Sequence, residues 1–321
     1  MTTRTLTRSL PILCGLTVAI TAAIRRWWDG PLRGIEQVVP ELPGSRGLLP
    51  TRDGVIGYRA HLGPSGAAVS TLVLVHGWGG SADVTWWGVL RHLQTPFVAI
   101  DLPGHGKSRI QGAFSIRRAA EMVVELVEAL EVPNPLLVGY SLGGPVAMEA
   151  ARSRPGLFCG MIGLATSLYW SRPRTRALAR AGPYVFGAPV SLGRALYRNR
   201  ARVQPELAPF ARWNLSALPG RPVLVEASTE LCRFDGRSWA AGLGLPIMWA
   251  VTTRDTVVAP HQQRESARLL GASVIELQAT HSCSHLAPTE VAEALNRLQA
   301  ALHRSVGGND EGPGELGASR R

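Results

Sequence analysis

Ser141 lies at the centre of the segment Gly139–Gly143, a serine with a glycine two residues before it and another two residues after it. An apolar run predicts a strand that ends at Tyr140, and small residues predict a helix from about Gly144. On so tight a strand-to-helix turn the serine backbone is strained and its hydroxyl stands clear of the sheet. The helix N-terminus places a positive dipole end beside any developing anion. Chance can supply the pentapeptide alone, but with this strand and helix it predicts a nucleophile for attack on a carbonyl carbon.

A nucleophilic serine needs a base, because its own hydroxyl is barely ionised at neutral pH. His281 and His285 both lie in a loop that follows a predicted strand, 273–277. We favour His281 because it is closer to the strand end, and His285 stays open as the alternative. The other histidines are predicted to support glycine-rich loops (His76, His105) or to lie in surface and packing positions (His61, His92, His261, His303).

The base in turn needs a carboxylate that holds its tautomer and stabilises the imidazolium. Asp255 closely follows a predicted strand, 247–251, and lies between the serine and the histidine in chain order. Its loop is therefore expected at the same edge of the sheet as Ser141. The carboxylates left as alternatives, none of which combines these two properties, are Glu226, Glu230, Asp235 and Asp101.

Acyl transfer also passes through a tetrahedral oxyanion, which preorganised N–H groups stabilise. The glycine-rich turn 76–80 follows the predicted strand 71–75 and is suited to aim a backbone N–H at that oxyanion. We expect the donors to be the N–H groups of Trp78 and of Leu142, the residue after the nucleophile. A phosphate-binding loop is the other interpretation of such a turn, but the turn lacks a Walker lysine and a full GxGxxG spacing.

The four cysteines are far apart and match neither a metal-ligand nor a disulfide spacing. We therefore expect reduced thiols, no disulfide framework and no bound metal. Cys283, two residues after His281, could resemble a nucleophile but lacks a positioned context and is interpreted as a packing residue.

Short apolar runs alternate with amphipathic segments through the middle and late chain, which predicts a mostly parallel sheet covered by helices. The runs lack polar alternation, as expected for strands buried on both faces. A hairpin with its turn at 52–54 precedes them, and Ser115 is expected to cap a helix. The last helix is expected from about Thr289. The predicted strands are Thr71–Val75, Pro96–Ile100, Leu136–Tyr140, Gly160–Leu164, Ile247–Val251 and Ser273–Leu277.

The alternation breaks between residues 171 and 245, where prolines punctuate short helical patches. This stretch predicts a helical insertion, a cap or lid, between the two parts of the core, 31–170 and 246–304. Within it, Pro222–Ala227 is expected to be helical rather than a strand. Residues 171–212 hold nine arginines and one acidic residue, Glu206, so the insertion presents either a solvated basic face or a lid that meets anionic groups.

The chain termini and the net charge bear on location and partners. Formal net charge is +11, with arginine supplying nearly all basic residues, yet no basic helix, finger or RNA-binding signature predicts nucleic-acid binding. The apolar run Leu10–Ile24 is 15 residues long, short of the ~20 that span a bilayer. Residues 1–30 are therefore interpreted either as an anchor-like or interfacial segment or as a helix packed on the core, giving a cytoplasmic or membrane-associated protein. Residues 305–321 are expected to form a disordered tail.

These motifs together resemble the α/β-hydrolase fold superfamily over about residues 48–303. The matching pieces, in the family's chain order of serine, acid and histidine, are His76–Gly79, Asp101–Ser108, Ser141, Asp255 and His281. Members commonly carry a proline seven residues after the catalytic histidine, which Pro288 supplies for His281 and not for His285. Thr280 departs from the pattern, because many members have glycine before the histidine. The insertion corresponds to the family's variable helical cap.

The resemblance implies hydrolysis of a carboxylic ester, of a small or lipid-like substrate, through an acyl-enzyme, with no metal or organic cofactor. Ser141 would attack, His281 would carry the proton and Asp255 would orient it. Acyl transfer, thioester cleavage and C–C bond hydrolysis on the same triad stay open, as does a non-catalytic ligand-binding member of the fold. An aromatic substrate pocket is expected from Trp170, Tyr169 and Trp213. The sequence does not indicate the oligomeric state.

Overall fold

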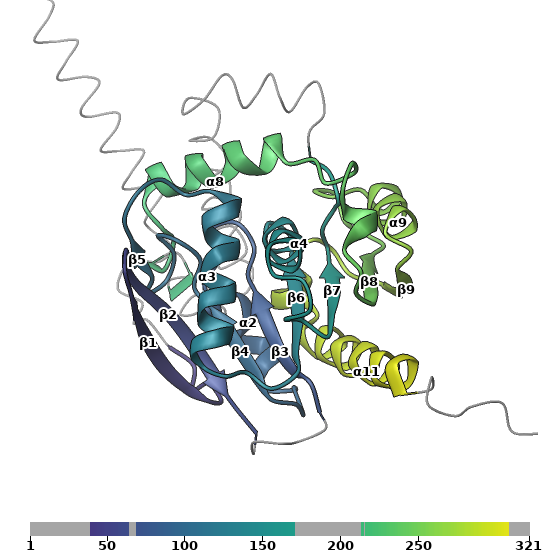
Figure 1. Ribbon diagram of the computed structural model, residues 1–321, viewed down its shortest axis with the longest axis horizontal. Coiled ribbons are helices and arrows are strands. Elements are labelled where there is room, and N and C mark those ends of the chain that lie inside the picture. The colour runs from purple at the N-terminus through teal and green to yellow at the C-terminus, as the bar shows by residue number, and fades with distance from the viewer. Residues whose placement is uncertain (1–38, 64–68, 171–212, 215, 308–321) are drawn as a thin grey trace, which may run out of the picture. The chain divides into compact units, whose positions relative to one another are not determined.

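The computed structural model describes residues 39–63, 69–170, 213–214 and 216–307 (Figure 1). The chain divides into two compact units. The larger, residues 41–186 and 217–321, holds every helix and strand named below, and the smaller comprises residues 1–40 and 187–216. Of the smaller unit the structure describes only a few residues, including the buried Trp213.

The larger unit is built on one sheet with the strand order β1-β2-β4-β3-β6-β7-β8-β9, to which the short β5 adds by pairing with β2. All pairings from β4 through β9 are parallel, and β2 is antiparallel to β1, β4 and β5. The strands are β1 Ser45–Thr51, β2 Gly54–His61, β3 Thr71–Val75, β4 Phe97–Ile100, β5 Arg109–Ile110, β6 Pro135–Tyr140, β7 Gly160–Leu164, β8 Ile247–Thr252 and β9 Ser273–Leu277.

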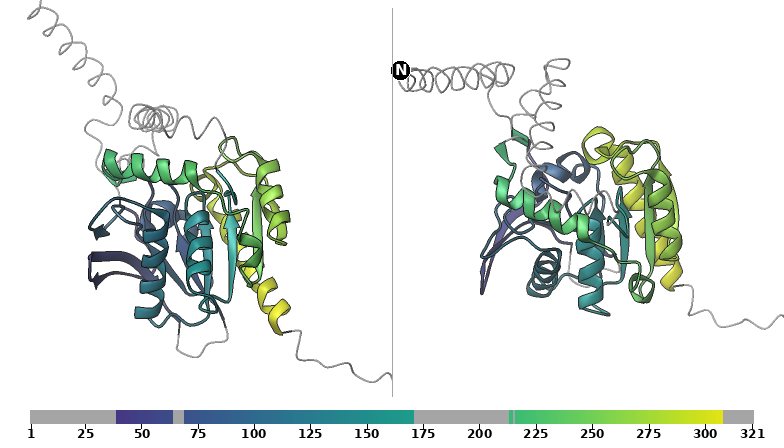
Figure 2. Two further views of the ribbon diagram at one scale, coloured as in Figure 1. Left: turned by 45° about the horizontal axis from the view of Figure 1, so that its top comes forward. Right: turned by 90° about the horizontal axis from the view of Figure 1, so that it is seen from above.

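Helices cover both faces of this sheet (Figures 1 and 2). The core on one face includes residues of α3 and α4, and the core on the other includes residues of α2, α10 and α11. The helices are α2 Ala82–Leu90, α3 Ile116–Ala129, α4 Gly143–Ser153, α8 Arg221–Arg233, α9 Pro260–Leu269, α10 Cys283–Leu286 and α11 Pro288–Gly307, with a 3-10 turn at Ala240–Gly242.

The central strands are apolar along their whole length because each contributes to both cores. In β3, Val73 and Val75 join the core on the α3 side, whereas Leu72 and Leu74 join the core on the α2 side. Successive side chains of a strand point to opposite faces, so a strand covered on both faces has no polar position. The sequence prediction of a mostly parallel sheet flanked by helices is therefore confirmed.

Most predicted elements are confirmed to within a residue. The hairpin β1–β2 is present, Ser115 caps α3 by accepting a hydrogen bond from the Arg118 N–H, and the 222–227 run is helical within α8. One interpretation was wrong: β9 is not buried on both faces, and Val274 in it is 44% exposed. β9 is the last strand in the sheet order, and strands at the edge of a sheet are more open to solvent than those inside it.

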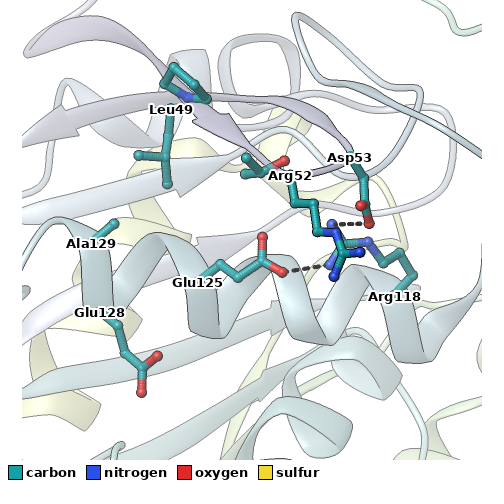
Figure 3. Close-up of a pocket in the computed structure, with 9 residues that line it drawn as sticks. Leu49, Arg52, Asp53, Arg118, Glu125, Glu128 and Ala129 are labelled. Carbon is teal, nitrogen blue, oxygen red and sulfur yellow. Dashed lines mark hydrogen bonds and ion pairs between the residues drawn. The ribbon is translucent and has the colours of Figure 1, made fainter.

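A surface groove of about 770 Å³ lies between the β1–β2 hairpin and α3 (Figure 3). Arg118 forms ion pairs there with Asp53 of the hairpin turn and with Glu125, about two helical turns further along α3, at 3.2 and 2.6 Å. Arg118 thus fastens the hairpin to α3, and no triad residue lines the groove.

Several interpretations fall outside the described residues. They concern the N-terminal segment 1–30, the arginine-rich stretch 171–212, and most of the predicted tail 305–321. Helix α11 runs to Gly307, so its last three residues lie inside the range expected to be a tail. Among the described residues, no helix has both the length and the apolar character needed to cross a bilayer.

Candidate active site

Ser141 lies between the last residue of β6 and the first turn of α4, with a backbone φ of 53°. A positive φ is costly for a residue with a side chain, so the surroundings must hold it. The Ser141 N–H donates to the Leu164 carbonyl at 3.0 Å, and the Thr166 hydroxyl donates to the Ser141 carbonyl at 2.6 Å. Glycine is required nearby: a Cβ on Gly139 would lie 2.6 Å from the Gly144 Cα. The strained turn expected from the sequence is present.

The structure brings Ser141, His281 and Asp255 into one continuous chain of contacts. Ser141 Oγ lies 3.0 Å from His281 Nε2, and His281 Nδ1 lies 2.9 Å from Asp255 Oδ2. The three residues follow β6, β9 and β8, whose carboxyl ends meet at the same edge of the sheet. The geometry thus unites the three residues that the sequence singled out.

The two contacts of His281 define its tautomer. A carboxylate only accepts hydrogen bonds, so Nδ1 carries the proton and donates it to Asp255. Nε2 is then the free acceptor that faces the Ser141 hydroxyl. The imidazole is partly accessible, with 19% of its side chain exposed, whereas the Asp255 carboxylate is fully enclosed. This arrangement can take the serine proton and stabilise the imidazolium that results.

Asp255 is held as a carboxylate by more than the histidine. Burial acts to raise its pKa, but the hydrogen bond and charge of His281 together with backbone N–H donors outweigh it, so the Asp255 pKa is lowered. The other donors are the N–H groups of Val257 (2.8 Å) and Val258 (2.9 Å) to Oδ1, and the side chains of Thr252 (2.9 Å) and Gln263 (3.2 Å) to Oδ2.

The turn after β3 lies beside the nucleophile. A Cβ on Gly77 would come within 3.2 Å of the Ser141 Cβ, so this glycine allows the turn to approach the serine. Within the described part of the chain, the N–H groups of Trp78 and Leu142 donate to no carbonyl or side chain. Unpaired N–H groups next to a nucleophile are suited to receive a developing oxyanion. The Trp78 indole itself donates to the Leu224 carbonyl of α8 at 2.9 Å.

His76 fixes the shape of that turn and takes no part in the triad. Its Nε2 accepts the Leu102 N–H at 3.1 Å, so its Nδ1 carries the proton and donates to the Gly77 carbonyl at 2.8 Å. Burial lowers the pKa of His76 to about 4 despite the hydrogen bond to Gly77. His76 is therefore a neutral brace between the turns that follow β3 and β4, as expected for a histidine in a glycine-rich loop.

The alternative acids and base have other partners. Asp101 is buried and receives Arg46 Nη1 at 2.7 Å and the Ala82 N–H at 2.7 Å. Glu226 and Glu230 accept the Phe114 and Ile116 N–H groups at the start of α3. Asp235 pairs with Arg237, and His285 Nδ1 contacts the Ser284 hydroxyl at 3.0 Å. None of these contacts joins them to Ser141.

Cys283 is a buried free thiol whose pKa burial raises to about 12. A thiol that stays protonated is a poor nucleophile, so its environment matches a packing residue. Among the described residues there is no cluster of three or more histidine, cysteine or acidic side chains that could hold a metal ion.

The aromatic residues expected to line a pocket occupy mixed positions. Tyr169 is 8% exposed, donates its hydroxyl to Glu265 at 2.5 Å and has Arg237 above its ring. Trp170 is partly buried and packs against the core on the α3 side. The ring that stacks on His281 is Tyr140 instead. The substrate role of Trp170, Tyr169 and Trp213 stays a prediction.

Sequence reasoning missed the residues that hold the triad in place. Thr252 and Gln263 bind Asp255, Thr166 binds the Ser141 carbonyl, and Tyr140 contacts His281. Thr252 and Tyr140 lie close in sequence to Asp255 and Ser141, so their positions could have drawn attention to them. Gln263 and Thr166 lie 8 and 25 residues from their partners, and no local pattern marks them.

Comparison with known proteins gives matches in both sequence and structure. A family model described as "Alpha/beta hydrolase family" matches residues 72–294. The pimeloyl-(acyl-carrier protein) methyl ester esterase of Methylococcus capsulatus is 32% identical over 212 residues, 62% of this chain and 81% of that enzyme. The enzyme of the same name from Serratia marcescens is 40% identical over 98 residues, which span 30% of this chain and only 36% of its own length.

A solved structure with the same arrangement of elements is a thermophilic esterase from Thermogutta terrifontis. It has a TM-score of 0.66 and 21% sequence identity, and the match covers 81% of this chain and all of that one. At this identity the likeness concerns the fold alone. It agrees with the sheet order and helix layers described above.

Proposed function

Because the chain belongs to the alpha/beta hydrolase family, we propose that it hydrolyses a carboxylic ester through an acyl-enzyme formed on Ser141. The observation that carries this proposal is the unbroken chain from Ser141 Oγ to His281 to Asp255, at 3.0 and 2.9 Å. The first contact is within the reach that proton transfer needs, and the second is a hydrogen bond that orients the base. The esterase names of its sequence relatives support the same reaction class.

In the first step, His281 Nε2 takes the proton of the Ser141 hydroxyl while Oγ attacks the ester carbonyl carbon. The protonated imidazole then gives that proton to the departing alkoxide, so the alcohol leaves and the acyl group stays on Ser141. Asp255 keeps Nδ1 protonated and offsets the positive charge of the imidazolium. Water repeats the sequence on the acyl-enzyme, with His281 as its base, and releases the acid.

The tetrahedral oxyanion of each step would lie between the N–H groups of Trp78 and Leu142. Both are without a donor role elsewhere in the described residues, and Gly77 brings the first turn against Ser141. The N-terminus of α4 adds its dipole to the second donor. One such donor is worth on the order of 10²–10³ in rate.

Helix α8 belongs to the inserted cap in this proposal and forms a wall beside the oxyanion turn. Trp78 donates to its Leu224 carbonyl, and the side chains of Leu224 and Leu218 lie against Gly79. An apolar wall favours an acyl group that is itself apolar, including a lipid-like one. The relatives' name, a methyl ester esterase, supports a small alcohol as leaving group.

Ester hydrolysis is tested with nitrophenyl esters of graded acyl length and methyl esters of the same acids, together with a fluorophosphonate probe. We expect the wild type to be labelled and to turn over, and Ser141→Ala to lose labelling and at least about 10³-fold in kcat. The matched control is Ser153→Ala, a serine at the end of the same helix. Labelling of Ser141→Ala as strong as that of the wild type would rule out Ser141 as the nucleophile.

Acyl transfer on the same triad differs only in what attacks the acyl-enzyme. Product analysis with an added alcohol separates the two, since transfer gives a new ester and hydrolysis gives the acid. Association with a membrane surface, which the apolar 10–24 run and the arginines and tryptophans after it support, is tested by vesicle sedimentation of the full chain and of a chain without residues 1–28. Equal sedimentation of the two chains would exclude that role.

A further inference from the structure

Tyr140, the residue before the nucleophile, contacts the main chain and the ring of His281 and also the oxyanion turn. Its hydroxyl donates to the backbone carbonyl of His281 at 2.7 Å, across 141 residues of sequence. Its ring stacks on the His281 imidazole, with centroids 5.8 Å apart and planes inclined by 30°. The ring also borders the oxyanion turn, because a Cβ on Gly77 would lie 3.1 Å from it.

The ring is itself tightly held. Tyr140 is 7% exposed, and Trp86, a fully buried side chain of α2, meets it edge-on with centroids 5.9 Å apart. The backbone of Tyr140 closes β6, which pairs with β3 and β7 on either side. A group fixed by the sheet and by the core is a rigid reference point for a loop, and His281 lies on such a loop between β9 and α10.

The ring contact also has an electrostatic consequence. When His281 accepts the serine proton it becomes a cation that faces the π-electrons of the Tyr140 ring, and a cation within about 6 Å of a ring centroid is stabilised. The hydroxyl acts differently, because it binds the main chain of His281 and sets where the imidazole stands. The ring of Tyr140 therefore acts on the charge of His281, and the hydroxyl of Tyr140 acts on its position.

Resting on the proposed function, we propose that Tyr140 is a positioning residue for the base. Its hydroxyl places His281 within reach of Ser141, and its ring stabilises the imidazolium. Tyr140 itself exchanges no proton and forms no bond in the reaction.

Two variants test the two parts. Tyr140→Phe keeps the ring and loses the hydroxyl, so kcat is expected to fall by roughly tenfold with KM unchanged, which matches the loss of one hydrogen bond. The acidic limb of the pH profile of kcat/KM, which reports protonation of the base, should stay in place. Tyr140→Leu loses the ring as well, so kcat should fall further and the limb should move to lower pH, because the imidazolium is no longer stabilised.

Within the described residues, the ionisable groups beside His281 and its acid include the Tyr140 hydroxyl itself, which donates to the His281 carbonyl. Asp255 faces Nδ1, and the neighbouring Cys283 thiol, with its pKa raised to about 12, stays neutral throughout the profile. A shift of the limb in Tyr140→Leu and not in Tyr140→Phe therefore reports on the ring. Tyr58→Phe, on β2 beside Gly47, is the matched control that removes a tyrosine hydroxyl without touching this site.

All rates are expressed per site labelled by the fluorophosphonate probe, so a partly unfolded variant is not counted as a slow one. Wild-type kcat per labelled site and an unmoved limb in both variants would overturn the proposal for Tyr140. If Tyr140→Leu does not fold, wild-type kcat per labelled site in Tyr140→Phe overturns it alone. Absence of labelling in the wild type contradicts the proposed function instead, so the two failures are distinguishable.

Discussion

Asp255 is a single residue whose carboxylate stays ionised although it is enclosed, because hydrogen bonds replace the missing water. Its side chain is fully enclosed, and both oxygens are occupied: two N–H groups bind Oδ1, while Thr252, Gln263 and His281 bind Oδ2. Burial alone would favour the neutral acid, and these donors reverse that preference. The carboxylate is thus charged before any substrate binds, and its direction is fixed.

Asp255→Asn is expected to lower kcat by about 10³–10⁴-fold while the fold is retained. An amide can donate its N–H to Nδ1 of His281, which puts the imidazole proton on Nε2, where it faces Ser141 and blocks proton abstraction. The measurement is kcat per labelled site, with Asp53→Asn in the hairpin turn as the control. A loss below about tenfold would show that His281 keeps its tautomer without Asp255.

Helix α8 shows how one element is fastened to the core. Its Glu226 and Glu230 carboxylates accept the Phe114 and Ile116 N–H groups, at 2.8 and 3.3 Å, where α3 begins. Acidic groups at a helix N-terminus satisfy N–H groups left without partners and complement the helix dipole. From the α8 side, Ala227 and Leu231 join the same core as α3. The helix is therefore bound to the core by polar contacts and by apolar packing.

Glu226→Ala is expected to reduce the free energy of unfolding by about 1–2 kcal/mol, because the part-buried Phe114 N–H loses its acceptor. Glu226→Gln keeps an acceptor and should cost less. Urea denaturation measures both, and Glu293→Ala, at an exposed position of α11, should stay within about 0.5 kcal/mol of the wild type. An equal loss in Glu226→Ala and Glu293→Ala would mean that the contact to α3 adds nothing.

The sequence delimited the buried strands and the exposed edge strand β9 equally well, but its expectation of burial held only for strands inside the sheet. Thr71–Val75 and Gly160–Leu164 match β3 and β7 to the residue, because a strand covered on both faces leaves an apolar run with clear ends. The exposure of β9 could not be foreseen, since strand order decides which strand lies at the edge and no local pattern encodes strand order. Glu226 was weighed as an acid for the base, yet it binds α3, a contact across 112 residues. Chain order and strand ends were enough to predict that Ser141, Asp255 and His281 come together.

At the scale of the whole described fold, three buried or enclosed histidines are kept neutral. Burial lowers the pKa of His76 to about 4, of His105 to about 3 and of His285 to about 4. The ordinary value of 6.5 applies in the unfolded chain, so between about pH 6.5 and 4 the unfolded state binds more protons. The stability of the fold therefore rises with pH in this window and falls on acidification.

His105→Leu isolates one of these contributions, since its buried Nε2 finds no hydrogen-bond partner in the described part of the chain and its ring lies beside His76 and Phe114. The decrease in unfolding free energy from pH 7 to pH 5 is expected to be smaller than that of the wild type by about 2 kcal/mol. Denaturant titrations at the two pH values measure it, and His261→Gln, at an exposed position, is the control. If His105→Leu and the wild type lose the same amount, His105 is not the proton acceptor during acid unfolding.

Trp78 takes part in two different functions through its backbone and its side chain. Its backbone N–H is a proposed oxyanion donor, and its indole binds the Leu224 carbonyl of the helix proposed to line the acyl group. Any change that moves α8 to admit a larger acyl group therefore also displaces the turn proposed to stabilise the oxyanion. A change in substrate range should therefore also change kcat. Variants that accept a wider range of acyl groups with an undiminished kcat should carry a compensating substitution in residues 76–80.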